Sequence, residues 1–541
     1  MDRTPLDDLR AAVKAAAGEL RANGAVDRLS LERPKKAGFG DYSTNAAMLL
    51  APVMGEAPRA VAERLGASLA AALGDHVERV EVAGPGFLNL FLADAWYLAA
   101  VRGVLDAGDR FGAGAQQQRI QVEFVSANPT GPLTAASGRH AAFGDALARI
   151  LELAGNTVER EYYFNDSGGQ VRRLGESILA RARGEEPPED GYQGTYVAEV
   201  AARIPDAASK PVDELAAEGV AILMAGIRDT LERYRVSFDR WFLERSLYDG
   251  SPSAWDQARD KLLADGFAYQ SDGALWLRTT TLAGDEKDRP LVKSSGEPTY
   301  LASDVAYHWD KLSRGYDRLV NVLGSDHHSY VVRLRAILAA EGADPERLIV
   351  PLLQFVHVVE GGERASMSKR RGDFVTLAEL IEEIGVDATR FFMLSRSAES
   401  TVDLDLTLAR QQSRENPVYY IQYAHARMSK ILRDAGEERV AEALAAAPAG
   451  LALEPAEREL VKKLLAFPAM VEEAAERYAP HLVSVYALEL AQAFTAYYRD
   501  CPILKAPDEA LKSFRLATTV ATRRVVAGSL GLLGVSAPET M

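Results

Sequence analysis

The amino-acid sequence predicts a multidomain α/β protein with an N-terminal α+β unit, a parallel-sheet unit in the middle and an all-α helical bundle at the C-terminus. The chain has 541 residues, which exceeds one ordinary domain and favours three or four. Its central part alternates apolar, strand-like runs with helical segments, which is typical of a parallel sheet. From about residue 407 onward, the apolar spacing is almost purely helical.

The composition narrows the class of protein. Hydrophobic residues make up 48% and charged residues 26%, as in ordinary globular proteins. The formal net charge of −15 argues against indiscriminate coating of polyanions. The single cysteine excludes an intramolecular disulfide and a zinc site built from several cysteines. We find no uncharged apolar run of 18 residues and no signal-peptide core, so we expect a cytoplasmic protein without a membrane span.

Residues 1–112 are predicted to form the α+β unit. An amphipathic helix begins the chain, and residues 57–74 have the spacing of a second one. Residues 77–93 carry two apolar strands around a Gly-Pro-Gly turn, which is typical of a β-hairpin. We expect Asp41 and Ser43 to cap the alanine-rich segment that follows them. A linker rich in glycine and glutamine then leads to the central unit.

Residues 118–406 form the predicted central unit, with an insertion near 184–245. The unit opens with alternating apolar and polar residues at 120–124, followed by a Pro/Gly turn and, from about Ser137, a helical pattern. Strand, turn and helix in this order are typical of a nucleotide-binding, Rossmann-type domain, where a helix N-terminus points at the ligand.

Residues 407–541 are predicted to form the helical bundle, with a cap or breaker at Glu454–Pro455 and another at Ala506–Pro507. Two groups of arginines are interpreted as solvated helix faces: Arg370 and Arg371, and Arg515, Arg523 and Arg524.

The common phosphate-binding and metalloprotease signatures are absent, because the sequence has no GxxxxGK[ST], GxGxxG or HExxH. Two other segments have the character needed to hold phosphates. ANPTGPLTAAS (127–137) lies at the predicted strand-to-helix turn, and SMSKRRGDF (366–374) is a short basic loop before a helix.

These two segments resemble the "HIGH" and "KMSKS" signatures of class I aminoacyl-tRNA synthetases, and the chain as a whole resembles the arginyl-tRNA synthetases. FGDYSTNAA and VAGPGFLNLFLA look like the N-terminal additional domain of that family, EREYYFNDSGGQ and VLGSDHHSYV like its catalytic core, and NPVYYIQYAHARM like its anticodon-binding domain. The resemblance implies an arginine–tRNA ligase that forms arginyl-adenylate from ATP, accompanied by Mg²⁺, and L-arginine. It further implies tRNA(Arg) as partner, a monomer and no tightly bound cofactor.

The resemblance also implies the site residues. The arginine-binding residues are Glu123, Ser126, Ala127, Asn128, Ser137, Tyr300, Asp304 and His328. The ATP-binding residues are Pro129, Gly131, Thr134, Gly138, Asp326, His327, Met367, Ser368 and Lys369. The tRNA-binding residues are Tyr419, Tyr420, Gln422 and Arg427. Lys369, Thr134 and Ser137 are the implied catalytic residues. A metal site at residues 326–328 is not expected, since adjacent side chains rarely converge on one ion.

The chemistry of these residue types fits arginine. A guanidinium presents its donors in a rigid fork, which carboxylates meet best. Tyr300 and Asp304 are one helical turn apart and would share a face. The alternatives are that Glu123 is an inward strand residue paired with an arginine, that Tyr300 is a core residue, and that Tyr419 and Tyr420 are core residues.

The sequence departs from the family pattern in both signatures. Thr134 and Ser137 stand where the family usually carries histidines, so hydroxyl donors remain while the possible positive charge is lost. Ser366 stands where a lysine is usual, although Lys369 is retained. His140 lies on the same predicted helix face as Ser137, and either brings an imidazole near or lies on the helix surface. These departures motivate two alternatives. One is a catalytically impaired synthetase-like paralogue that binds tRNA or arginine as a regulatory module. The other is an enzyme that adenylates another acceptor.

Overall fold

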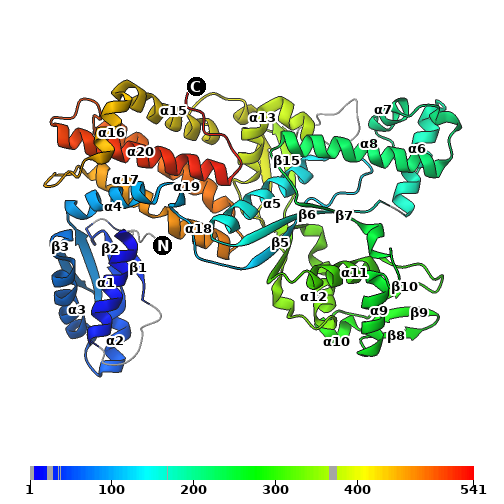
Figure 1. Cartoon of the computed structure of the whole chain (residues 1–541), viewed down its shortest axis with the longest axis horizontal. Helices are drawn as coiled ribbons and strands as arrows, with labels where there is room; N and C mark the ends of the chain where they lie inside the picture. The colour runs from blue at the N-terminus through cyan, green and yellow to red at the C-terminus, as the bar shows by residue number, and fades with distance from the viewer. Residues whose placement is uncertain (1–4, 21–28, 35, 37, 167, 365–374) are drawn as a thin grey trace.

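The computed structural model describes residues 5–20, 29–34, 36, 38–166, 168–364 and 375–541. Figure 1 shows an elongated molecule, with the N-terminal unit below the helical bundle at one end and the central unit at the other. Within the described parts of the chain, no helix is both long and apolar enough to cross a membrane.

The N-terminal unit is an antiparallel sheet packed with helices. Its strands are β1 (Leu31–Glu32), β2 (Tyr42–Thr44), β3 (Val77–Ala83) and β4 (Phe87–Leu92), in the order β1-β2-β4-β3. Its helices are α1 (Pro5–Leu20), α2 (Ala46–Met54), α3 (Pro58–Leu73) and α4 (Asp94–Ala107). The predicted hairpin is β3 and β4, paired antiparallel. The α+β prediction for this unit is therefore confirmed.

The prediction that Asp41 and Ser43 cap α2 is wrong. Asn45 stands at the N-cap and makes no capping bond with its side chain. Ser43 lies in β2 and pairs with Asn89 of β4. Asp41 contacts residues that are distant in the sequence. Its carboxylate accepts a hydrogen bond from the backbone N–H of Leu92 at 2.7 Å and forms an ion pair with Lys462 of the helical bundle at 2.6 Å. Asp41 thus ties the N-terminal unit to the bundle.

A parallel sheet forms the centre of the middle unit, as predicted. Its strands are β5 (Arg119–Glu123), β6 (Thr157–Phe164), β7 (Arg240–Leu243), β11 (Arg318–Asn321) and β13 (Leu348–Ile349). Their order is β13-β11-β5-β6-β7, and each neighbouring pair is parallel. The chain runs outward from β5 in one direction and returns to β11 on its other side. The carboxyl ends of β5 and β11 are therefore the switch point at which such sheets bind ligands.

Helices and small sheets surround this sheet. The helices are α5 (Ala135–Leu153), α6 (Gly169–Ala182), α7 (Tyr196–Arg203), α8 (Val212–Arg233), α9 (Ala254–Ala264), α10 (Thr279–Ala283), α11 (Tyr300–Ser313), α12 (Val331–Ala340) and α13 (Leu377–Met393). The additional strands are β8 (Ala268–Ser271), β9 (Ala274–Leu277), β10 (Arg289–Val292), β12 (Leu323–Gly324), β14 (Leu352–Leu353), β15 (Val356–Glu360), β16 (Glu363–Arg364) and β17 (Val402–Asp405). Helices α6, α7 and α8 share an apolar core of their own, so they form a distinct lobe.

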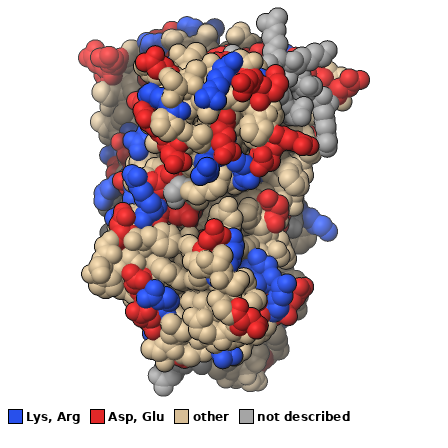
Figure 2. Space-filling model, turned by 90° about the vertical axis from the view of Figure 1, so that its right-hand side faces the viewer, with Lys and Arg blue, Asp and Glu red and all other residues tan. Residues whose placement is uncertain are grey.

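Figure 2 shows the side of the molecule formed by this lobe and by the elements around α9. Acidic and basic side chains are interspersed over that face, and neither sign covers it. The net negative charge of the chain is therefore not gathered there into one broad field.

The remainder of the chain is helical, as predicted. Its helices are α14 (Leu406–Ala409), α15 (Pro417–Ala435), α16 (Glu437–Ala445), α17 (Pro455–Leu465), α18 (Phe467–Glu476), α19 (His481–Asp500) and α20 (Glu509–Leu532). The interpretation of Arg515 as a residue of a solvated helix face is wrong. Its guanidinium is buried and pairs with buried Glu457 at 2.7 Å. The pair Arg370–Arg371 lies outside the described residues.

Candidate active site

The structure brings the exits of the two signature segments together. Thr134 forms an isolated antiparallel bridge with Thr376. The N–H of Ala135 donates to the carbonyl of Val375 at 2.9 Å, and that of Leu377 donates to the carbonyl of Leu133 at 2.8 Å. The chain therefore leaves the second signature beside the N-terminus of α5. Met367, Ser368 and Lys369 themselves lie outside the described residues.

Thr134 and Ser137 organise the N-terminus of α5. Thr134 is the N-cap, and its Oγ1 accepts a hydrogen bond from the N–H of Ser137 at 3.2 Å. The two hydroxyl oxygens lie 3.2 Å apart. A helix N-terminus of this kind favours an anion, because its N–H groups and dipole carry partial positive charge. Gly138 packs closely against Leu377: a Cβ there would lie 2.7 Å from Cδ1 of Leu377 and would displace that side chain.

The loop after β5 has a strained backbone. Val125 and Ser126 adopt positive φ values of 67° and 41°. Such conformations cost roughly 1–3 kcal/mol each and are kept where surrounding contacts enforce them. Here the hydroxyl of Ser126 donates to Oε1 of Glu123 at 3.0 Å and accepts from the N–H of Tyr163 at 3.2 Å. The carbonyl of Ala127 accepts from the hydroxyl of Tyr162 at 2.8 Å. The loop is thus held in one shape above the strand ends.

Other residues of this loop have separate partners. Asn128 is exposed, and its amide donates to Gln170 at 2.7 Å. Pro129 is buried. Gly131 faces Tyr196, whose hydroxyl would lie 3.2 Å from a Cβ at that position. The α6–α7 lobe therefore contacts the loop directly.

Three carboxylates from separate elements lie close enough for their charges to act on one another at this loop. Glu123 ends β5, Glu244 follows β7, and Asp304 lies in the first turns of α11. Burial raises the pKa of Asp304 to about 7; the negative charges of Glu123 and Glu244 add to this rise, and a hydrogen bond from Tyr330 opposes it. The hydroxyl of Ser303 donates to Glu244 at 2.8 Å. Such an arrangement is suited to a cation with several N–H donors.

The structure settles two alternatives from the sequence. Glu123 is paired with a cation, but its partner is Lys311, whose Nζ lies 2.6 Å from Oε2, and not an arginine. Tyr300 is not a core residue, because 68% of its surface is exposed at the start of α11. Its ring is therefore free to contact a ligand.

The segment Ser325–Tyr330 is a short 3₁₀ helix with Asp326, His327 and His328 exposed. Nε2 of His327 lies 3.7 Å from the carboxylate of Asp326. Among the described residues, no group of three or more His, Cys, Asp or Glu side chains is arranged to hold a metal ion.

His140 is not a helix-surface residue. Its imidazole is partly buried, and burial, followed by the charge of Arg139, lowers its pKa to about 4. Asp326 and His327 are among the charges that act on it. A neutral imidazole thus lies between α5 and the segment that carries these two residues, one turn beyond Ser137.

Sequence reasoning missed Glu244, Tyr330 and Lys311. A signal existed for Glu244, because it directly follows a strand at the carboxyl edge of the parallel sheet. A signal also existed for Lys311, which lies two helical turns after Asp304 and hence on the same face of α11. Tyr330 carried no such signal, since its contact with Asp304 depends on how α12 packs against α11.

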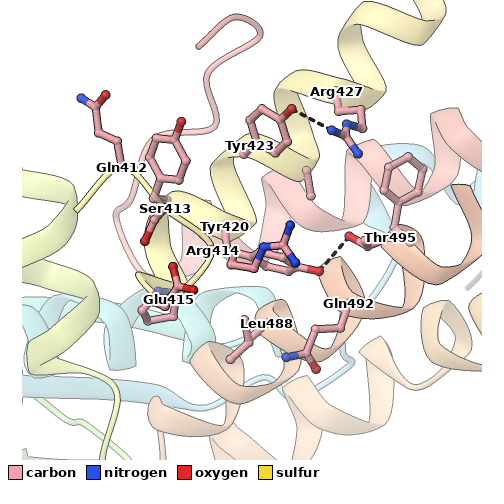
Figure 3. A pocket seen from close by; sticks show the side chains of 14 residues that line it. Gln412, Ser413, Arg414, Glu415, Tyr420, Tyr423, Arg427, Leu488, Gln492 and Thr495 are labelled. Carbon is pink, nitrogen blue, oxygen red and sulfur yellow. Dashed lines mark hydrogen bonds between the residues drawn. The ribbon is translucent and has the colours of Figure 1, made fainter. Parts of the chain in front are cut away.

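A hollow lies in the helical bundle, between α15 and α19. It has a volume of about 750 Å³ and is lined by Tyr419, Tyr420, Tyr423 and Arg427, among others. Figure 3 shows Tyr423 and Arg427 joined by a hydrogen bond, and Tyr420 joined to Thr495. Tyr419 and Tyr420 are half-buried and line the hollow, and Tyr420 also packs against the hydrophobic core.

Aromatic and guanidinium groups stack along this hollow. The rings of Tyr419 and Tyr423 are nearly parallel, with centroids 6.2 Å apart. The guanidinium of Arg427 lies 4.7 Å from the ring centroid of Tyr423 and 5.1 Å from that of Tyr498. Flat groups of this kind bind unpaired bases by stacking.

Gln422 does not belong to this surface. Its side chain is buried, and its amide donates to Asp387 at 2.8 Å and to the backbone carbonyl of Ser536 at 3.0 Å. Its contact with tRNA stays a prediction, and its amide here joins α15 to α13 and to the C-terminal segment.

The parallel sheet with its ligand-binding switch point, the anion-binding helix start beside the residues that follow the second signature, and the appended helical bundle define a class I aminoacyl-tRNA synthetase. Three family models match the chain: the arginyl-tRNA synthetase N-terminal domain at residues 7–92, the class I (R) tRNA synthetase catalytic domain at 220–405, and the DALR anticodon-binding domain at 421–541. The chain belongs to the arginyl-tRNA synthetase family.

Individual relatives agree with this assignment. An arginine–tRNA ligase of Frankia alni is 47% identical over 553 residues, which cover 99% of each chain. One of Syntrophotalea carbinolica is 44% identical over 96% of each chain. The solved arginyl-tRNA synthetase of Thermus thermophilus superposes with a TM-score of 0.77 at 24% identity over 99% of each chain, which supports the fold.

Proposed function

We propose that this protein is an arginine–tRNA ligase, which uses ATP to join L-arginine to tRNA(Arg) and releases AMP and diphosphate. The observation that carries the proposal is the cluster of Glu123, Glu244 and Asp304, which a single loop after β5 connects to the anion-binding start of α5. A cationic side chain and an anionic phosphate thus have adjacent places. The full-length relatives named as arginine–tRNA ligases support the same activity.

The reaction proceeds in two steps without a covalent enzyme intermediate. A carboxylate oxygen of arginine attacks the α-phosphorus of ATP, which is bound as its magnesium complex, and diphosphate leaves. A hydroxyl at the 3′ end of the tRNA then attacks the carbonyl carbon of the adenylate, and AMP leaves. Positioning and electrostatic stabilisation supply the catalysis, because binding both reactants makes the first step effectively intramolecular.

In this proposal, Asp304, Glu123 and Glu244 receive the guanidinium, and Tyr300 packs against the side chain of arginine. The amino and carboxyl groups of arginine lie near Ser126, Ala127, Asn128, Ser137 and His328. The strained loop, which carries Ser126, Ala127 and Asn128 and connects Glu123 to the start of α5, supports this division.

For ATP, the proposal places the phosphates at the start of α5. The hydroxyls of Thr134 and Ser137 and the N–H groups of the first turn donate there, and Gly138 lets Leu377, which follows the second signature, pack close to α5. Lys369 supplies the positive charge for the leaving diphosphate. Pro129, Gly131, Asp326, His327, Met367 and Ser368 complete the proposed ATP-binding set.

For tRNA, we place unpaired anticodon-loop bases in the hollow of the helical bundle. Tyr419, Tyr420 and Arg427 remain candidate contacts, and Tyr423 is added to them. The proposal also keeps the division into units 1–112, 118–406 with an insertion near 184–245, and 407–541, a monomeric state and a cytoplasmic location. Neither the impaired paralogue nor an enzyme with another acceptor gains support from the relatives, which are named as ligases.

Charging of tRNA tests this function. Purified protein is incubated with ATP, labelled arginine and tRNA(Arg), and label bound to tRNA is measured. We expect multiple turnovers with arginine and none with lysine. Binding of tRNA without any charging would overturn the ligase function in favour of the regulatory module. Adenylate formation without transfer to tRNA would point to another acceptor.

Arginine affinity is expected to rise with pH up to about 7, the pKa to which burial raises Asp304. Below that pH the empty site holds a proton on Asp304, which the guanidinium must displace. The Kd for arginine should therefore fall roughly tenfold per pH unit below about pH 7 and level off above it. Calorimetric titrations in buffers of different ionisation enthalpy would measure the released proton. Asp304→Asn should abolish that release; unchanged release in the variant would assign the proton to another group.

Arg427→Ala is expected to raise the KM for tRNA by roughly tenfold or more, since stacking on one base is worth about 1–3 kcal/mol. The KM for arginine should stay within about twofold, because Arg427 lies in the bundle and not at the sheet. Arg477→Ala, which removes an exposed arginine paired within its own helix region, is the matched control. Equal effects of the two variants would show that only general positive charge matters.

A further inference from the structure

A buried lysine lies directly beneath the carboxylate cluster. The side chain of Lys311 on α11 is fully buried. Its ammonium donates to Oε2 of Glu123 at 2.6 Å and to Oδ1 of Asn321 at 2.9 Å, and lies 4.2 Å from the ring centroid of Tyr307. Glu123 and Asn321 are opposite each other at the ends of β5 and β11. The ammonium therefore occupies the switch point of the sheet.

A neutral histidine, His308, fixes which atoms donate and which accept hydrogen bonds around Lys311. Burial, followed by the charge of Lys311, lowers the pKa of His308 to about 3. Its Nδ1 lies 2.8 Å from the carbonyl of Asp304, so Nδ1 carries the hydrogen and Nε2 is left as an acceptor. The amide of Asn321 donates to that Nε2 at 3.3 Å, which turns its Oδ1 toward Lys311. The ammonium thus has two fixed acceptors.

Each carboxylate oxygen of Glu123 accepts a hydrogen bond, and the two bonds fix the orientation of the carboxylate. Oε2 accepts from Lys311, and Oε1 accepts from the hydroxyl of Ser126 at 3.0 Å. Each carboxylate oxygen keeps a further lone pair. Since the lysine approaches from inside the sheet and Ser126 lies in the strained loop, the carboxylate is held in one rotation.

We infer that Lys311 is a positioning and specificity residue for arginine: it holds Glu123 in its binding orientation and cancels one of the three negative charges of the pocket. This inference rests on the proposed function. With Lys311 present, the three ionised carboxylates and the ammonium carry a net charge of −2, which a bound guanidinium reduces to −1. Without it, three carboxylates would share one space, which is costly unless they take up protons.

The polar and charged groups that act on Glu123 come from every element that packs around it. Lys311, Tyr307 and Asp304 lie on α11, Tyr163 lies on β6, Ser126 lies in the loop, and Asn321 lies on β11. Glu244 and Tyr330 act on the cluster through Asp304. Lys311 is the buried ammonium among them. Lys311 also lowers the pKa of buried Glu161, which keeps Arg314 as a partner at 2.6 Å. Loss of Lys311 therefore leaves Glu123 without a counter-charge in the unliganded site, and arginine must then displace an additional proton.

The test compares Lys311→Met with wild type by calorimetric arginine titration of the full chain, between about pH 6 and pH 9. At about pH 7 we expect the Kd for arginine to rise tenfold or more and the number of protons released on binding to increase by about one. The Kd should recover as the pH rises. The Kd for ATP should stay within about twofold, since Lys311 does not face the start of α5.

Two further variants separate charge from shape. Lys311→Arg keeps a cation and should release the wild-type number of protons, even if its Kd differs. The double variant Lys311→Met/Glu123→Gln removes both members of the pair, so it avoids a buried unpaired charge and should also lose the additional proton. It keeps the test open if the single variant does not fold. Lys261→Met, on α9 and paired with Asp265, is the surface control.

The outcomes are distinct. An additional proton in Lys311→Met that is absent from Lys311→Arg and from the double variant supports the inference. Wild-type proton release in Lys311→Met, or equal losses of arginine and ATP affinity, would overturn it. Failure of the wild-type protein to bind arginine at all would overturn the proposed function instead.

Discussion

Replacing Asp304 by alanine is expected to weaken arginine binding by about 2–5 kcal/mol, the cost of leaving a buried charge without its partner. That range corresponds to a rise in Kd from roughly thirtyfold to several thousandfold. Asp304 is partly buried on α11, faces the same space as Glu123 and Glu244, and accepts a hydrogen bond from Tyr330. The bound guanidinium would lose the acceptor that α11 contributes.

Calorimetry with arginine and, separately, with ATP measures this effect. ATP affinity should change by less than about threefold, because the start of α5 is untouched. Asp304→Asn keeps the shape of the side chain and an acceptor for Tyr330, so it isolates the contribution of the charge. Asp260→Ala, an exposed residue of α9, is the control for surface changes. Wild-type arginine affinity in Asp304→Ala would show that the guanidinium binds elsewhere.

Replacing Arg390 by methionine is expected to lower the free energy of unfolding by about 3–5 kcal/mol, as when one partner of a buried ion pair is removed. Arg390 and Asp145 are both fully buried and lie 2.5 Å apart. The guanidinium also donates to the carbonyls of Leu533 at 2.8 Å and Tyr234 at 2.9 Å. One side chain thus joins α13 to α5, to the end of α8 and to the C-terminus.

Urea denaturation measures this loss as a change in the free energy of unfolding. Arg410→Met is the matched control, because Arg410 forms ion pairs that are about 40% exposed, and such pairs contribute about 0–1 kcal/mol. Arg149, which is about one-third exposed, also donates to Asp145 at 2.9 Å and remains its partner in Arg390→Met. The double variant Arg390→Met/Asp145→Leu should recover part of the loss, since it removes the buried carboxylate that has lost its buried partner. A loss below about 1 kcal/mol in Arg390→Met would show that Arg149 is a sufficient partner for Asp145.

Much of the fold followed from local pattern. The β3–β4 hairpin, the strand that ends at Glu123, the helix that Thr134 caps and the purely helical C-terminal part each depend on neighbours a few residues away. Period-two alternation, turn residues and helical spacing report such short-range preferences. The family resemblance added the arginine-binding assignment of Asp304, whose face on α11 the structure places beside Glu123.

What the sequence determined was therefore the order of the elements and the chemistry at the strand ends and helix starts. Tertiary structure alone decided which side chains are free. Glu123 is paired with Lys311, 188 residues away, and Gln422 is bound to Ser536, 114 residues away. Arg515 is buried against Glu457 rather than solvated. The physical reason is that burial and charge pairing depend on which helices pack together, and local periodicity carries no information about partners so distant along the chain.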